Sequence, residues 1–125
     1  MHEEPDLLQL TRRLWLARTQ RIQPMRWRPA ADLYRHPGGW LIKFELAGVA
    51  REEVEVSVHG RHLRVRGRRR DVAARSSLDC LSLEIAYSAF ERVVALPADL
   101  ERARIETRFQ DGMLFVNVET EVERP

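Results

Sequence analysis

The chain has 125 residues, of which 44% are hydrophobic and 32% are charged, so it can form one folded domain and is too apolar for a disordered chain. Its 21 basic and 19 acidic residues leave a net charge of only +2, which argues against a dedicated binder of polyanions. A single cysteine, Cys80, excludes an internal disulfide and favours a reducing compartment. No secretory leader or bilayer-spanning apolar run is recognisable, so we expect a cytoplasmic protein without a membrane span.

The first 28 residues are expected to form an arm outside the folded domain. Leucines recur at helical spacing after Asp6, a residue type that caps helix N-termini, and this pattern predicts a short amphipathic helix. The segment 20–29 contains Pro24 and Pro29 and lacks periodicity, which is typical of a linker. We expect the arm to contact other chains, with packing on its own domain or binding to a membrane surface as alternatives. Its candidate contact residues are Leu7, Leu10, Leu14, Trp15, Met25 and Trp27.

Residues 29–118 form a single predicted β-rich domain. Apolar and polar residues alternate with the period of two that half-buried strands show, in short segments separated by turn residues such as Pro37 and Asp111-Gly112. This spacing predicts an all-β fold, an antiparallel β-sandwich, followed by a short acidic tail at 119–125. The expected strands cover residues 31–34, 40–46, 54–58, 63–65, 93–96, 105–109 and 113–118.

Four segments of this domain match short sequence motifs, and the motifs occur in a defined order. Residues 90–97 fit Phe-x-Arg-x-x-x-Leu-Pro, and the next hairpin fits Ala-x-x-x-Asn-Gly-x-Leu-x-Val, with Thr107, Asp111, Gly112, Leu114 and Val116 at the named positions. Upstream, residues 44–49 fit x-x-Leu-Pro-Gly-Val, with Ala47 in the place of Pro, and residues 60–67 fit x-x-x-Leu-x-Ile-x-Gly. The ordered set resembles the α-crystallin domain of the small heat-shock proteins, bacterial type, which implies an immunoglobulin-like sandwich.

The resemblance also implies how two chains would pair. The segment 67–79 follows neither the helical nor the strand period, and a loop of this length in a compact domain is usually functional or disordered. In bacterial members a loop here reaches the partner subunit, and we place its exchanged strand at 78–82. Arg92 is expected to form an ion pair at the interface, and Ser88 stands where the family usually has Gly. The predicted homodimer interface comprises Ala31, Asp32, Leu33, Tyr34, Cys80, Leu81, Ser82 and Arg92.

The activity that the resemblance implies is that of an ATP-independent holdase, which binds partly unfolded client proteins and prevents their aggregation without a cofactor. We expect clients to bind the arm and a groove between two strands. The tail lacks the Ile-x-Ile tag that builds large shells in the family, which favours a dimer or a small assembly. The predicted groove residues are Val54, Val56, Val58, Ile105, Thr107 and Phe109.

We find no catalytic motif, so the chain is not expected to be an enzyme. Scattered histidines, including His59 and His62 beside one turn, lack the further ligands of a zinc site. Cys80 at a dimer edge would permit oxidative crosslinking between subunits. Two other functions stay open, a co-chaperone adapter with a p23-like sandwich and a nucleic-acid binder. The nucleic-acid alternative depends on an arginine run without stacking aromatics, Arg64, Arg66, Arg68, Arg69 and Arg70.

Overall fold

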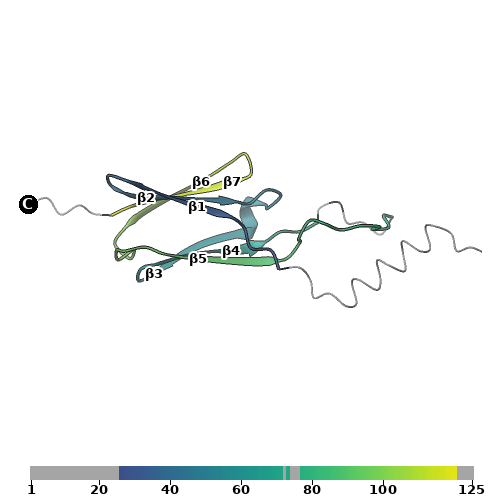
Figure 1. Cartoon of the computed structure of the whole chain (residues 1–125), viewed down its shortest axis with the longest axis horizontal. Helices are drawn as coiled ribbons and strands as arrows, with labels where there is room; N and C mark the ends of the chain where they lie inside the picture. Colours follow the sequence, from purple (N-terminus) through teal and green to yellow (C-terminus); the bar gives the residue numbers. More distant parts are fainter. Residues whose placement is uncertain (1–25, 72, 74–76, 121–125) are drawn as a thin grey trace, which may run out of the picture.

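The computed structural model describes residues 26–71, 73 and 77–120. Within them, seven strands form two antiparallel sheets that lie face to face, with strand order β1-β2-β7-β6 in one and β3-β4-β5 in the other (Figure 1). A single 3-10 turn, η1 (Arg51–Glu53), precedes the smaller sheet. The strands are β1 (Ala31–His36), β2 (Gly39–Glu45), β3 (Val54–His59), β4 (His62–Arg68), β5 (Ala89–Ala95), β6 (Arg104–Gln110) and β7 (Met113–Glu119).

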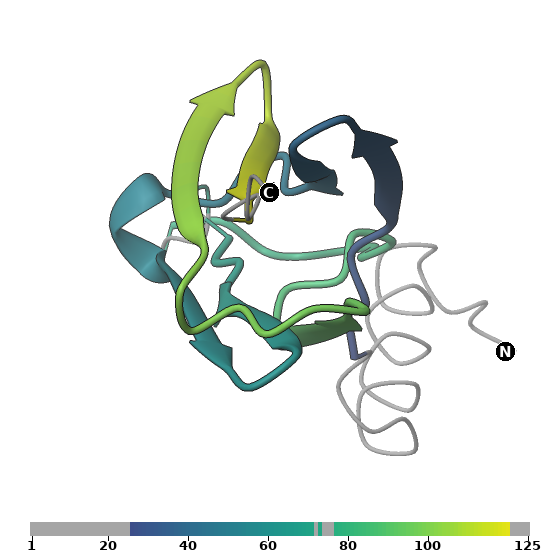
Figure 2. The same cartoon turned by 90° about the vertical axis from the view of Figure 1, so that its left-hand side faces the viewer.

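The core lies between the two sheets because alternate residues of each strand point inward. Figure 2 shows the two layers end on. The larger sheet contributes Ile42 and Phe44 from β2 and Val116 from β7, and the smaller sheet contributes Leu63 and Val65 from β4, all fully buried. No charged or polar residue is buried among the described residues.

The expected all-β sandwich is confirmed, with strand bounds that differ from the predicted ones by a few residues. The predicted turn at Asp111-Gly112 joins β6 to β7, and both residues have positive φ, 52° and 75°. Two positive φ angles are the geometry of the tight turns whose twist suits a hairpin. The predicted N-terminal helix lies outside the described residues. No helix among the residues that the structure describes has the length and apolarity of a membrane span.

Gly39 lies at a position of β2, between β1 and β7, that has no room for a side chain. It pairs with His36 of β1 and with Glu119 of β7, and a Cβ atom at this position would lie 1.9 Å from the carbonyl oxygen of Val118. A contact that short cannot be relieved without moving the backbone of β7. The adjacent Gly38 meets only the side chain of His36, at 3.7 Å.

We therefore expect Gly39→Ala to destabilise the fold by about 2 kcal/mol or more, the usual effect of forcing extra volume into a packed site. Gly38→Ala, its matched control, should change the free energy of unfolding by less than about 0.5 kcal/mol. Urea unfolding followed by circular dichroism, at one protein concentration for all variants, measures both. Equal midpoints for the two variants would contradict this account of the sheet.

Candidate binding surfaces

The predicted groove residues lie along two strand edges on the same side of the sandwich. β3 and β6 are edge strands of different sheets (Figure 2). Their inward side chains are half-buried and pack against the common core, with the exception of Thr107, which is exposed. The structure thus brings the two predicted rows to one side of the molecule. The half-buried members are Val54, Val56, Val58, Ile105 and Phe109.

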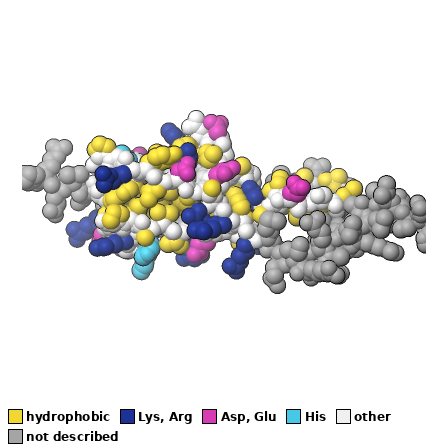
Figure 3. Space-filling model, in the orientation of Figure 1, with side chains coloured by type: hydrophobic (Ala, Val, Ile, Leu, Met, Phe, Trp, Pro, Cys, Tyr) yellow, Lys and Arg dark blue, Asp and Glu magenta, His cyan; other side chains and the backbone are white. Residues whose placement is uncertain are grey.

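The opposite side of the sandwich is bordered by the free edges of β1 and β5 (Figure 2). Figure 3 looks at this side and shows apolar side chains gathered there, with charged groups around them. Leu33 and Tyr34 of β1 are 51% and 47% exposed. Within the described residues, the outer edge of β1 pairs with no other strand. Its backbone groups are therefore available to a strand from another chain.

Polar contacts join side chains of β1 and β2 on the outer face of this edge. Lys43 of β2 forms an ion pair with Asp32, at 3.4 Å, and donates a hydrogen bond to the hydroxyl of Tyr34, at 3.3 Å. The hydrogen bond to Tyr34, followed by the one to Asp32, holds the pKa of Lys43 above its ordinary value. Two predicted interface residues of β1 are therefore linked through one lysine on the neighbouring strand.

The loop between β4 and β5 presents a row of exposed apolar residues. Its described part extends beyond the end of the sandwich (Figure 1). Leu81, Leu83 and Ile85 alternate along it and are 42%, 43% and 54% exposed, and Leu78 is 57% exposed. Exposed Cys80 lies among them, with its thiol 3.6 Å from the carbonyl oxygen of Ser82. Water-exposed apolar side chains gathered in one segment are typical of an interaction site.

The exchanged strand predicted at 78–82 does not form in the single chain, since residues 78–84 have no regular secondary structure. A strand of this kind needs a second edge to pair with, so strand exchange stays a prediction. Sequence reasoning missed Leu83 and Ile85 as members of the exposed row. Their alternation with Leu81 was the available signal, and it favours a strand centred on Leu83.

Arg92 points toward the inside of the sandwich rather than along its surface. It lies on the inward side of β5 with Phe90 and Val94, and its guanidinium donates to the carbonyl oxygen of Pro29. Burial lowers its pKa, and the charge of nearby Arg28 lowers it further. Within the described part of one chain its partner is a carbonyl group and not a carboxylate. The predicted interfacial ion pair stays a prediction.

Trp27, a candidate contact residue of the arm, packs on its own domain. Its ring meets that of Phe90 edge to face, with centroids 5.0 Å apart, and the guanidinium of Arg69 lies 3.6 Å from its centroid. In the single chain, Trp27 therefore packs on its own domain, which was one of the expected alternatives for the arm. The other candidates in the arm, Leu7, Leu10, Leu14, Trp15 and Met25, lie outside the described residues.

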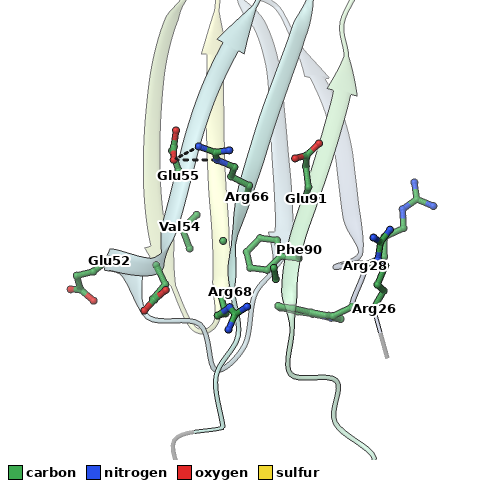
Figure 4. A pocket seen from close by; sticks show the side chains of 13 residues that line it. Arg26, Arg28, Glu52, Val54, Glu55, Arg66, Arg68, Phe90 and Glu91 are labelled. Carbon is green, nitrogen blue, oxygen red and sulfur yellow. Dashed lines mark hydrogen bonds and ion pairs between the residues drawn. The ribbon is translucent and has the colours of Figure 1, made fainter. Parts of the chain in front are cut away.

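The arginine run on and after β4 is largely neutralised by glutamates. Arg64 lies 2.7 Å from Glu91 of β5, and Arg66 lies 3.1 Å from Glu55 of β3 (Figure 4). Arg70 pairs with Glu53 at 3.0 Å, and Arg69 faces Trp27. Phosphate binding needs cations that are free to replace counterions. Three of the five arginines, Arg64, Arg66 and Arg70, have a glutamate partner within the described residues.

A shallow hollow lies over one end of the smaller sheet, with a volume of about 920 Å³. Both signs of charge line it, with Arg26 and Arg28 on one side and Glu52 on the other (Figure 4). Val54 and Phe90 supply apolar lining. No group of three or more metal-ligating side chains occurs within the part of the chain that the structure describes.

Comparison with known proteins decides the family. A sequence model of the Hsp20/alpha crystallin family matches residues 32–125. The chain belongs to the small heat-shock protein family. It is 22% identical over 90 residues to small heat shock protein C2 of Rickettsia felis, covering 72% of this chain and 58% of that protein. It is 32% identical over 87 residues to the chloroplastic 26.7 kDa heat shock protein of Oryza sativa subsp. japonica, covering 66% of this chain and 36% of that protein.

A solved structure supports the same fold. Heat shock protein 16.0 from Schizosaccharomyces pombe superposes with a TM-score of 0.68 at 22% identity, covering 80% of this chain and 96% of that one. The aligned part of this small heat-shock protein spans 58% of the length of the Rickettsia protein and 36% of the length of the Oryza protein. The family and the fold are therefore established, and the match favours a small heat-shock protein over a p23-like adapter.

The neutralised arginine run yields a test of the nucleic-acid alternative. We expect the natural protein to show no measurable binding to a single-stranded oligonucleotide at about 150 mM salt, where phosphate contacts are weakened. A double variant, Glu55→Gln with Glu91→Gln, frees two arginines and should bind at low salt, with a salt slope steeper by about 0.7 per freed cation. Fluorescence anisotropy at several salt concentrations measures this. Tight binding by the natural protein would reinstate the alternative.

Proposed function

We propose that this small heat-shock protein is an ATP-independent holdase, which binds partly unfolded proteins reversibly and keeps them from aggregating. The observation that carries the proposal is the combination of incompletely buried apolar rows with a heavily charged chain. Val56 of β3 and Phe109 of β6 are only half-buried, whereas the outer face of the smaller sheet carries two exposed ion pairs. Apolar surface binds exposed segments of unfolded chains. The charged faces keep the protein itself in solution.

The mechanism follows from mass action and needs no turnover. A protein that binds unfolded chains lowers their free concentration. Exposed apolar surface makes such chains prone to aggregate at micromolar concentrations and above, so reversible capture slows aggregation. Nothing in this scheme consumes a nucleotide or requires a cofactor. Affinity for the client and the supply of free binding surface determine the effect.

For client binding we propose the side of the sandwich between β3 and β6, together with the arm. Val56 and Phe109 are apolar and only half-buried there, although their strands border a fully buried core. An extended apolar segment of a client can add its backbone to such an edge and place alternate side chains against it. We therefore propose that this side of the domain receives clients.

For the assembly we propose a cytoplasmic homodimer in which the loop of each chain pairs with β1 of the other. The outer edge of β1 has no strand beside it among the described residues. The loop carries an alternating row of exposed apolar residues and has no strand of its own. Pairing would satisfy the backbone of both segments and bury Leu33 with the loop residues. An ion pair between Arg92 and a carboxylate of the partner is part of this proposal, and it would require the Arg92 guanidinium to leave the carbonyl oxygen of Pro29.

Holdase activity is tested by light scattering from a heated test protein without ATP. At equimolar subunits we expect the natural protein to slow aggregation several-fold. Val56→Glu should weaken this protection, since a carboxylate on the half-buried side of β3 opposes apolar binding. Ser57→Glu, on the exposed side of the same strand, should leave it unchanged. Circular dichroism checks that both variants fold. Scattering as fast with the protein as without it would refute the holdase.

The proposed dimer is tested separately by sedimentation. We expect the natural protein to sediment as a dimer or a small multiple of one at micromolar concentration. Leu83→Asp should raise the dissociation constant of the dimer by tenfold or more, because it places a charge in an apolar contact. Ser77→Asp introduces the same charge into an exposed position of the same loop and serves as the control. A monomeric natural protein, or equal dissociation constants for both variants, would contradict loop exchange.

A further inference from the structure

The two ends of the β4–β5 loop are joined at its base. The backbone N–H of Arg69 donates to the carbonyl oxygen of Ser88, at 3.0 Å. The side chain of Arg69 donates to the carbonyl oxygen of Ala86, at 2.9 Å, and to that of Ala47, at 3.3 Å. One arginine thus ties the beginning of the loop to its end and to the β2–η1 connection.

Trp27 joins this base from a third direction. Its backbone N–H donates to the hydroxyl of Ser88, at 3.0 Å, and its indole lies beneath the Arg69 guanidinium, 3.6 Å from it. The edge-to-face contact with Phe90 fixes the other side of the ring. A planar guanidinium can stack on an indole while it still donates to carbonyl groups, which a lysine ammonium cannot do in this geometry. Glycine at position 88 would provide no hydroxyl for the Trp27 N–H.

We infer that Trp27, Arg69 and Ser88, called here the Trp27 latch, position the loop for its partner, so that Trp27 is a positioning residue of the dimer and not a client contact. The inference deepens the proposed function and rests on its loop-exchanged dimer. Ile85, the end of the exposed row, lies three residues before Ser88, and Ala86 between them is buried. A change in direction at the base therefore moves the whole row relative to the partner's β1.

The latch also links the loop to the arm. Trp27 is the last but one of the 28 residues assigned to the arm, so one anchor holds the end of the arm and the base of the loop. Loss of the indole removes the stacking surface of Arg69 and the edge contact of Phe90 together. Because these contacts share one residue, the effects of changing Trp27 and Arg69 are expected to be non-additive.

The test uses the full chain and two measurements. Trp27→Leu and Arg69→Ala should each speed amide hydrogen exchange at positions 27 and 69, the two backbone N–H groups that donate in the latch, by about tenfold, the effect of losing one desolvated cation–π contact. The same variants should raise the dissociation constant of the dimer by about tenfold, and the double variant should be little worse than either single one. Ser88→Ala should have a smaller effect of the same sign.

Matched controls come from neighbouring residues. Arg68→Ala removes an exposed arginine beside Arg69, and Ser77→Ala removes an exposed loop hydroxyl outside the predicted interface; both should leave exchange at the base and the dimer unchanged. Faster exchange at the base with an unchanged dimer would overturn the positioning role. Unchanged exchange in Trp27→Leu would overturn the latch itself. A monomeric natural protein would refute the proposed dimer and with it the positioning role, whereas hydrogen exchange would still test the contacts of the latch.

Discussion

Apolar contact between the inner faces of the two sheets is the interaction on which the rest of the structure depends. Leu63 and Val65 of β4 meet a layer formed by β2 and β7, and each fully buried side chain of this kind contributes about 1.5–3 kcal/mol by leaving water. Within the described residues no helix covers either sheet, so the outer faces and the strand edges of the sandwich are exposed to solvent. The binding surfaces of this small heat-shock protein follow from that constraint.

Open edges are a hazard in a β-protein because their unpaired backbone groups invite aggregation. Here the two sides of the sandwich differ. On one side, β3 and β6 expose half-buried apolar rows above the core. On the other, β1 is free, while an inward-pointing Arg92 interrupts the apolar inner side of β5. The same incomplete pairing that endangers a monomer would supply the sites that the proposed dimeric holdase requires.

The arginines and glutamates of the smaller sheet form ion pairs that cannot be read from the order of the sequence. The arginines of β4 look like a basic run in one dimension, but antiparallel pairing places Glu55 and Glu91 on the strands at either side. The resulting ion pairs are exposed, and each contributes little to stability. Their main effect is to reduce the positive charge that the arginines of β4 give to this face.

The sequence alone determined the sandwich, the strand segments and the family, because the period-two alternation and the turn at Asp111-Gly112 are local signals that survive without tertiary contacts. It also indicated the rows of β3 and β6, since alternation marks which residues share a face. Only the tertiary structure decided where residues outside the period-two pattern of the strands lie. Trp27 had no local pattern, and its place against Arg69 and Phe90 depends on contacts between segments far apart in the chain. The partners of the β4 arginines were likewise fixed by strand register, which brings residues together that no short window of sequence contains.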